Sequence, residues 1–285
     1  APHYAEFISK NYPCAGRIKT TIDGNIQLYI EKLVPEYLKK LEKHKVSNAA
    51  VVVLDNATGD VLAFLGSADY FDEKAQGYVN GVLALRQPGS ALKPFVYAAA
   101  FEDGFLPSDK IKDEDTFFEG GFRPKNYDEG YHGEVTLRQA LGCSYNIPAV
   151  ALAQKLGTGR VLETLRKSGF TTLTKPAQDY GLGIALGNGE VSLLELANAY
   201  RALANGGVWT PVRFALEPLS FQTGSARRAI AQDAAFMVSD VLADNAARSP
   251  AFGLNSPLNL PFTFAAKTGT SKDYRDNIAA GYNRR

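Results

Sequence analysis

Two side chains of one short segment, Ser90 and Lys93, have the types and the spacing of a nucleophile and its base. Residues three apart on a helix share a face, so the amine of Lys93 would sit one turn below the hydroxyl of Ser90. A serine alcohol is a poor nucleophile and an ammonium group cannot take its proton, so Lys93 must be held neutral. Burial and a second cation both lower the pKa of a lysine, and Lys267 is the candidate cation. The segment predicts covalent catalysis by a serine.

Three short motifs follow one another along the chain: S-A-L-K at residues 90–93, S-Y-N at 144–146 and K-T-G at 267–269. By ordinary residue frequencies, S-x-x-K is expected about once in a chain of this length, so it means little by itself. All three in this order are expected in roughly one such chain in a hundred. They match the S-x-x-K, S-x-N and K-T-G set of the penicillin-interacting serine enzymes.

The nucleophile lies at the start of a predicted helix, directly after a Pro-Gly pair. There the amide of Ser90 and a second amide from the region of Thr270 could bind a developing oxyanion, which the helix dipole also favours. An apolar segment then runs to Phe101 and stops before Gly104. Because this segment is apolar almost all round, the helix is predicted to be buried.

Other segments predict the elements that surround this helix. Thr21 and Asp23 are of the capping type and precede an amphipathic helix through Leu41, which Pro35 can kink. The β-rich runs at residues 49–54 and 61–65 predict a hairpin. Strands at both ends with helices between them predict an α+β domain whose sheet joins strands distant in the sequence. Capping boxes mark two later helix starts, at Thr136 with Gln139 and at Ser192 with Glu195. Residues 257–266 lead into a β-like region that is broken at 267–270, and residues 278–282 could begin one more strand.

The composition excludes several classes of protein. The 285 residues carry 31 Lys and Arg against 30 Asp and Glu, so the formal charge of +1 excludes a strongly basic nucleic-acid binder. With 45% hydrophobic residues the chain can bury a sizeable core, which excludes disorder. No apolar run approaches the roughly 20 residues of a membrane helix. Cys14 and Cys143 form no CxxC pair, and His3, His44 and His132 lack metal-ligand spacing, so no disulfide framework, metal or cofactor is predicted.

Four stretches resemble the transpeptidase domain of a class A penicillin-binding protein: RQPGSALKPFVYAAAFEDG, YHGEVTLRQALGCSYNIPAVALAQKLG, GNGEVSLLELANAYRALANGG and AAKTGTSKDYRDN. The string DNAARSPAFGLNSPLNLPF further resembles the one-C type of this class. The resemblance covers nearly the whole chain from Thr20, so it is more specific than the three motifs alone. It implies the α+β fold of the penicillin-binding transpeptidases and serine β-lactamases, in which helices flank an antiparallel sheet and an all-helical subdomain is added.

The resemblance implies a serine D,D-transpeptidase that cross-links peptidoglycan stem peptides through an acyl-enzyme and is acylated by β-lactams. By position, Ser90 would be the nucleophile and Lys93 its base. Ser144 would relay a proton to the leaving D-alanine, and Asn146 would hold the amide carbonyl of the substrate. The strand that anchors the terminal carboxylate of the stem peptide, or of a β-lactam, would comprise Lys267, Thr268, Gly269 and Thr270.

The resemblance also implies parts outside this chain. Residues 1–20 contain Pro and Gly without periodicity and predict a linker, and residues 21–285 are predicted to form the transpeptidase domain. In the family further strands and a helix follow the K-T-G strand, so the sheet of this chain is expected to be incomplete. Either a second polypeptide supplies the missing strands or the domain is shortened.

A membrane tether and a glycosyltransferase domain are expected upstream of the chain. They would place the protein outside the cytoplasmic membrane, in the periplasm or on the outer face of that membrane. The expected partners are the donor and acceptor stem peptides and β-lactam antibiotics, with no nucleic acid.

Two other functions stay open from the sequence. A serine β-lactamase shares the nucleophile apparatus but needs an additional carboxylate to activate a deacylating water, and the sequence does not show one. A non-catalytic receptor for β-lactams or muropeptides would bind without turnover. Cys143 with His132 would suit a thiol enzyme, although a buried inert thiol is the favoured interpretation. The glycines at 181, 183 and 187 lack the GxGxxG pattern, so a loop before the next helix is preferred to a nucleotide site.

Overall fold

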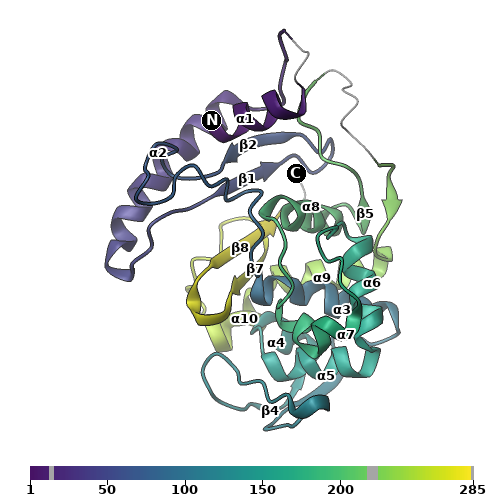
Figure 1. Ribbon diagram of the computed structural model, residues 1–285. Coiled ribbons are helices and arrows are strands. Elements are labelled where there is room, and N and C mark those ends of the chain that lie inside the picture. Colours follow the sequence, from purple (N-terminus) through teal and green to yellow (C-terminus); the bar gives the residue numbers. More distant parts are fainter. Residues whose placement is uncertain (13–15, 217–223, 284–285) are drawn as a thin grey trace.

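A computed structural model describes residues 1–12, 16–216 and 224–283 of the chain. The molecule has two parts with a hairpin between them (Figure 1). One part holds two helices and the first hairpin, and the other is mostly helical. The elements that build the first part and the intervening hairpin are α1 (Pro2–Asn11), α2 (Gly24–Leu41), β1 (Val51–Leu54), β2 (Val61–Leu65), β7 (Ala265–Thr270) and β8 (Asn277–Tyr282).

The helix and hairpin predicted near the N-terminus are confirmed. The carboxylate of Asp23 accepts hydrogen bonds from the amides of Asn25 at 2.8 Å and Ile26 at 3.1 Å, which caps α2 as its sequence predicts. Strand β1 pairs antiparallel with β2. The apolar stripe of α2 packs on this hairpin, where Ile30 and Ala63 belong to one buried cluster.

Part of the predicted linker is instead a packed helix. Helix α1 occupies Pro2–Asn11, and its Tyr4 and Ile8 are buried. The Tyr4 hydroxyl donates to the carbonyl oxygen of Phe214 at 2.5 Å. Tyr4 and Ile8 are four residues apart and so share one face of the helix, a spacing that the scattered prolines obscure. This face belongs to the cluster around Phe64, so α1 is fastened to the first part.

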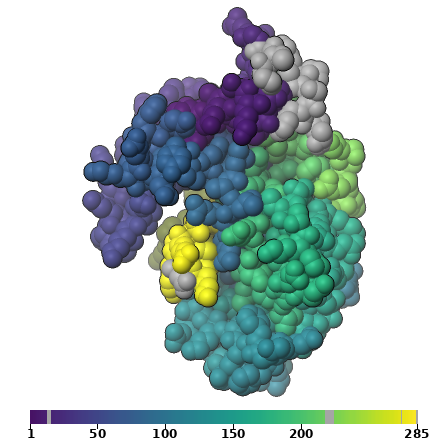
Figure 2. Space-filling view, in the orientation of Figure 1, coloured from purple at the N-terminus to yellow at the C-terminus, as the bar shows by residue number. Residues whose placement is uncertain are grey.

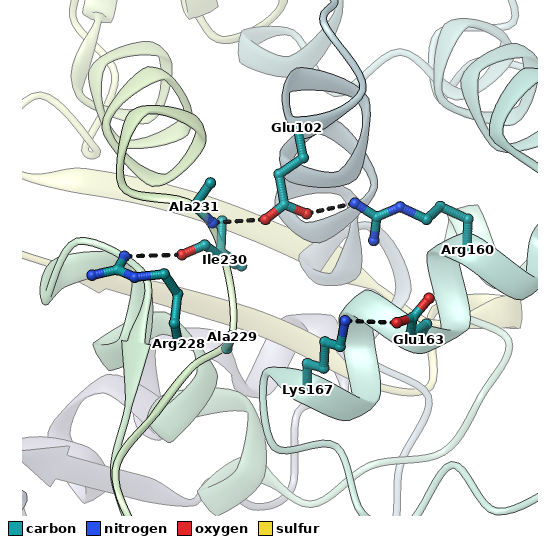
Figure 3. A pocket seen from close by; sticks show the side chains of 8 residues that line it. All are labelled: Glu102, Arg160, Glu163, Lys167, Arg228, Ala229, Ile230 and Ala231. Carbon is teal, nitrogen blue, oxygen red and sulfur yellow. Dashed lines mark hydrogen bonds and ion pairs between the residues drawn. The ribbon is translucent and has the colours of Figure 1, made fainter.

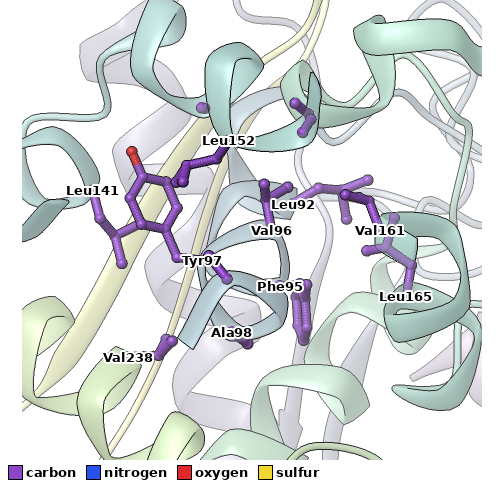
Figure 4. Close-up of a cluster of buried hydrophobic side chains, with 14 of the residues drawn as sticks. Leu92, Phe95, Val96, Tyr97, Ala98, Leu141, Leu152, Val161, Leu165 and Val238 are labelled. Atoms are coloured by element: carbon purple, nitrogen blue, oxygen red, sulfur yellow. The ribbon is translucent and has the colours of Figure 1, made fainter. Parts of the chain in front are cut away.

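Helix α3 (Lys93–Glu102) is the centre of the helical part. The short 3₁₀ turn η2 (Gly89–Leu92) leads into it. The prediction of a buried helix is confirmed, since every residue from Lys93 to Phe101 is buried. Its apolar side chains meet those of helices on several sides, and Figure 4 shows Phe95, Val96 and Tyr97 within this cluster. Lys93, the last residue of the S-A-L-K motif, is therefore the first residue of a helix that is buried along nearly its whole length.

The elements around α3 include both helices that begin with the predicted capping boxes at Thr136 and Ser192. The helices are α4 (Leu137–Gly142), α5 (Asn146–Leu156), α6 (Thr158–Lys167), α7 (Ala177–Tyr180), α8 (Leu193–Ala204), α9 (Gln232–Ala243) and α10 (Asn245–Phe252). The short strands are β3 (Lys110–Asp113), β4 (Gly133–Thr136), β5 (Val208–Trp209) and β6 (Arg227–Arg228). The other 3₁₀ turns are η1 (Glu42–His44), η3 (Glu119–Gly121), η4 (Gly181–Leu186) and η5 (Lys272–Tyr274).

The fold is α+β, helix-rich with small antiparallel sheets, yet one expectation about its strands is wrong. The strand predicted at residues 278–282 is confirmed as part of β8, whereas β7 runs through residues 267–270, where the pattern predicted a break. The two strands pair antiparallel, with Lys267 opposite Ala280. Within the described residues no strand pairing joins this hairpin to β1 and β2, so the predicted sheet of sequence-distant strands is not formed. Strand patterns indicate which segments are extended, whereas packing decides which edges meet. Here α8 contacts both β1 and β8, and Asn56 Nδ2 donates to the carbonyl of Asn283 at 2.8 Å.

Across the described parts of the chain, no helix combines the length and the apolar character that crossing a membrane requires.

Candidate active site

Ser90 lies in the η2 turn, where the backbone comes very close to strand β7. A Cβ atom on Gly89 would lie 2.2 Å from the carbonyl oxygen of Thr270, and one on Gly269 would lie 2.1 Å from that of Pro88. Both distances are too short for any side chain, and Gly89 also has a positive φ of 56°. These two glycines let the turn and the K-T-G strand touch backbone to backbone. The first and third motifs thereby become neighbours although they lie far apart in the sequence.

Lys93 is fully buried one turn after Ser90 and points into the S-Y-N loop. Its Nζ donates to Asn146 Oδ1 at 2.6 Å, to the carbonyl of Tyr145 at 3.1 Å and to the carbonyl of Ser144. Burial is the main cause that holds the pKa of this amine well below 10.5, and the charge of Lys267 lowers it further. Lys267 thus acts on the pKa of Lys93 in the direction that the sequence analysis requires of a second cation.

Lys267 approaches the same loop from β7. Its Nζ donates to Ser144 Oγ at 2.7 Å and to the carbonyl of Thr268 at 2.8 Å. Burial lowers the pKa of Lys267 to about 7, and the charge of Arg248 contributes. Ser144 Oγ also accepts from Lys93 Nζ at 3.3 Å, so this hydroxyl lies between the two amines.

The structure joins Lys93 to the second motif more directly than to the first. Among the described residues, no hydrogen bond links the hydroxyl of Ser90 to the amine of Lys93. The predicted direct contact is thus not made in this structure, because the amine is engaged by acceptors of the S-Y-N loop. The half-buried Ser90 stays one turn away on the same helical segment, as its spacing predicts.

The K-T-G strand presents its residues on two faces. Side chains alternate along a strand, so Thr268 and Thr270 share the face opposite to that of Lys267. Both threonines are partly exposed, whereas Lys267 and Gly269 are buried. In the space-filling view, the β7–β8 hairpin reaches the surface beside the helical part (Figure 2). Just beyond Thr270 a cavity of about 350 Å³ has the following lining: Leu85, Arg86, Gln87, Glu190, Ser271, Lys272, Arg275 and Asp276.

Three residues of this region were not predicted from the sequence: Arg248, Asp113 and Asn126. Arg248 of α10 is buried, its Nη2 donates to the carbonyl of Leu242, and its Nη1 has no hydrogen-bond partner among the described residues. Asp113 ends strand β3 with no exposed surface, and Asn126 donates to both of its carboxylate oxygens, at 2.9 and 2.8 Å. None of the three lies in a recognisable motif. Asp113 could have been found from the alternating pattern of β3, because its carboxylate falls at a position that the alternation predicts to be buried.

The residues considered for a thiol enzyme, a nucleotide site or a metal site do not form such sites in the described parts of the chain. Cys143 is buried, its Sγ donates to the carbonyl of Ala247 at 3.3 Å, and burial raises its thiol pKa. The ring of His132 contacts Asp113 and Asp128 instead, so no thiol–imidazole pair forms. Cys14 lies outside the described residues. The glycines at 181 and 183 belong to the η4 turn, and the described residues contain no group of His, Cys, Asp and Glu suited to a metal ion.

A second charged cavity, of about 360 Å³, lies at the opposite end of α3. Figure 3 shows Glu102 between Arg160 and the backbone of Ala231, with Lys167 beside Glu163. Its ion pairs measure 2.7 Å from Arg160 Nη2 to Glu102 Oε2 and 2.6 Å from Lys167 Nζ to Glu163 Oε1. The lining residues include no serine, cysteine or histidine, so we assign no reaction to this cavity.

The convergence of the three motifs defines a serine acyltransferase type of site, and comparison with known proteins agrees. Residues 49–284 match the penicillin binding protein transpeptidase domain, so the chain belongs to this family. It is 32% identical over 269 residues to penicillin-binding protein 1C of Escherichia coli (strain K12), covering 94% of this chain and 34% of that protein. This match supports the resemblance to the one-C type.

Other relatives extend the comparison. Over 253 residues the chain is 32% identical to penicillin-binding protein 1A of Neisseria meningitidis serogroup A, covering 82% of this chain and 31% of that protein. It therefore spans about a third of the length of these curated relatives. Penicillin-binding protein PonA1 of Mycobacterium tuberculosis has the same fold, with a TM-score of 0.79 at 24% identity over 99% of this chain and 79% of that one.

Proposed function

We propose that this chain is the catalytic domain of a serine D,D-transpeptidase that cross-links peptidoglycan stem peptides through an acyl-enzyme and is acylated by β-lactams. The observation that carries the proposal is the place of Ser144 Oγ, 2.7 Å from Lys267 Nζ and 3.3 Å from Lys93 Nζ. A hydroxyl between two buried amines, beside a serine at a helix start, is suited to passing protons. Membership of the transpeptidase family supports the same reaction class.

Acylation would begin with attack of Ser90 Oγ on the carbonyl carbon of the penultimate D-alanine. The hydroxyl proton would pass to neutral Lys93, the C–N bond to the terminal D-alanine would break, and the leaving amine would take a proton through Ser144. The lowered pKa of Lys93 supports its role as base. Hydrogen bonds between catalytic groups often tighten only when substrate binds, so the separation of Ser90 and Lys93 in the free protein is compatible with this step.

Substrate recognition would use the face of β7 and the S-Y-N loop. The hydroxyls of Thr268 and Thr270, on the partly exposed face, would hold the terminal carboxylate directly. A protonated Lys267, on the other face of the strand, would attract the carboxylate by its positive charge. Asn146 Nδ2 donates to the carbonyl of Lys125 at 2.6 Å, which leaves its second amide hydrogen for the carbonyl of the substrate. Gly269 would keep the strand close to the turn that carries the nucleophile.

The acyl-enzyme would then be attacked by the amine of an acceptor stem peptide, so the site must position that amine and exclude water. In the whole protein we expect a membrane tether and a glycosyltransferase domain, with the transpeptidase outside the cytoplasmic membrane. The length of the curated relatives, about three times that of this chain, supports further domains.

A fluorescent penicillin tests the proposal. We expect a covalent adduct at Ser90 that persists for hours, identified by mass spectrometry of the digested protein. Absence of an adduct, or an adduct elsewhere, would contradict the proposed nucleophile. Rapid release of the label would indicate a β-lactamase. A stable adduct without acceptor-dependent cross-linking of stem peptides would indicate a receptor.

A further inference from the structure

The structure assigns Asp113 a positioning role in acylation: we propose that its buried carboxylate, through Asn126 and His132, holds the S-Y-N loop in the shape that binds the amine of Lys93. The inference rests on the proposed function, because it takes Ser90 as nucleophile and Lys93 as base. Asp113 makes no hydrogen bond to Ser90 Oγ or to Lys93 Nζ in the described structure, so it would act through its neighbours.

One route from Asp113 to Lys93 consists of hydrogen bonds. Asn126 Nδ2 donates to both carboxylate oxygens of Asp113, at 2.9 and 2.8 Å. Its Oδ1 accepts from the backbone amide of Asn146 at 2.7 Å. Asn146 Oδ1 in turn accepts from Lys93 Nζ at 2.6 Å. Because Asn126 uses both ends of its amide group, it fixes the start of α5 relative to the carboxylate.

A second route passes through an aromatic stack. His132 donates its backbone amide to Asp113 Oδ2 at 3.1 Å, and its Nδ1 lies 2.6 Å from the same oxygen. The imidazole stacks on the ring of Tyr145 with centroids 4.0 Å apart and an interplanar angle of 14°. The carbonyl of Tyr145 accepts from Lys93 Nζ at 3.1 Å. Both routes therefore start at one carboxylate and end on one amine.

The S-Y-N loop needs such support because its backbone is strained. Ser144 has a φ of 63°, in the left-handed region that a non-glycine residue adopts at a cost. A residue held there persists only when its surroundings over-determine it. The same carbonyl and hydroxyl of Ser144 accept hydrogen bonds from Lys93, so slackening of the loop would move the acceptors of the base.

The negative charge of Asp113 also affects the pKa of Lys93, an effect that a purely structural role would not have. Burial and Lys267 lower the pKa of Lys93, whereas Asp113 raises it. The other titratable groups that interact with this carboxylate are Tyr97 from α3, Tyr145 from the loop between α4 and α5, and His132 from the segment before β4. Cys143 interacts with Tyr97 and Tyr145, and Asp128 contacts His132. Removal of the negative charge would therefore let Lys93 lose its proton at lower pH.

The experiment measures the second-order rate of penicillin acylation against pH for Asp113→Asn, Asn126→Ala and His132→Phe. His132→Phe keeps a ring on Tyr145 but loses the side-chain hydrogen bond to Asp113. We expect each variant to acylate up to about 10²-fold more slowly, as for a misplaced catalytic group. Asp113→Asn alone should shift the acidic limb of the profile to lower pH. The double variant Asp113→Asn, Asn126→Ala should be no slower than the worse single variant, because the two residues act in series.

The matched control is Asp115→Asn, two residues further along the chain, whose exposed carboxylate pairs with Arg123. It should acylate at the wild-type rate. Thermal unfolding identifies folded variants, and if Asp113→Asn does not fold, Asn126→Ala and His132→Phe decide the matter. Folded variants with the wild-type rate and an unshifted limb would overturn the inference. Failure of the wild-type protein itself to be labelled at Ser90 would instead refute the proposed function.

Discussion

The two ends of helix α3 hold their ionisable side chains in different surroundings: Lys93 is fully buried, whereas Glu102 and Arg160 are partly exposed. At the first turn, the amine of Lys93 is enclosed among carbonyl and amide oxygens, and the charge of Lys267 lowers its pKa further. At the last turn, Glu102 accepts from Arg160 Nη2 at 2.7 Å and from the amide of Ala231 at 2.6 Å. Among the described residues, the amine at the first end makes no ion pair, whereas Glu102 at the last end is paired with Arg160.

The consequence appears in the direction of the pKa shifts. Burial lowers the pKa of Lys93 well below 10.5. Burial alone would also lower the pKa of Arg160, but hydrogen bonding to Glu102 and its charge raise it overall. A buried cation whose pKa is lowered can act as a base, whereas a paired one holds two elements together. Pairing thus distinguishes the proposed catalytic end of this helix from the end that holds neighbouring elements together.

Loss of the nucleophile should have the largest effect. We expect Ser90→Ala to abolish covalent labelling by penicillin without unfolding the protein, because a partly exposed hydroxyl contributes little to the core. Mass spectrometry and thermal unfolding check both halves. Retained labelling at another residue would place the nucleophile elsewhere.

Loss of the base should come next. Lys93→Ala is expected to slow acylation by about 10²- to 10⁴-fold, as for removal of a general base. Stopped-flow measurement with a chromogenic β-lactam checks this rate. A near-normal rate would mean that the proton of Ser90 goes to another group.

The pH dependence should be smaller but directional. Lys267, with a pKa of about 7 in the free protein, loses its charge as pH rises, and the charge is needed to hold the carboxylate of penicillin. The second-order acylation rate should therefore fall above pH 7, by up to about tenfold per pH unit. Lys267→Arg keeps the charge at all these pH values and should remove the fall. A flat profile in the wild-type protein would contradict the assignment.

Substitution of Glu102 should lower the stability of the protein without changing its acylation rate. Glu102→Ala leaves Arg160 without its nearer partner and removes the acceptor of the Ala231 amide, so we expect the free energy of unfolding to drop by about 1–3 kcal/mol. The acylation rate with penicillin should stay within about twofold of wild type. Glu102 lies at the other end of the helix and, among the described residues, shares no partner with the proposed active site, so the two sites should behave independently. Urea unfolding and the labelling rate check the two effects. A large fall in acylation would erase the contrast between the two ends.

Local elements followed from the sequence because their causes are local. Asp23 caps α2, Thr136 and Ser192 form capping boxes, and the apolar segment after Ser90 becomes the buried helix. Helix α1 was missed because its buried face, with Tyr4 and Ile8, is short and lies among proline and glycine. The pairing of the strands was predicted wrongly, because a strand pattern does not indicate which other strand will pair with it.

By itself, the sequence determined the set of candidate reactive groups: a serine and a lysine three residues apart on a helix start, followed by S-Y-N and K-T-G. Only the tertiary structure decided that the amine of Lys93 turns to the S-Y-N loop, that Arg248 lies near Lys267, and that Asp113 supports the loop. The physical reason is that helix phase and capping depend on residues within one turn. A pKa and a hydrogen-bond network depend instead on burial and on charges brought from distant parts of the chain.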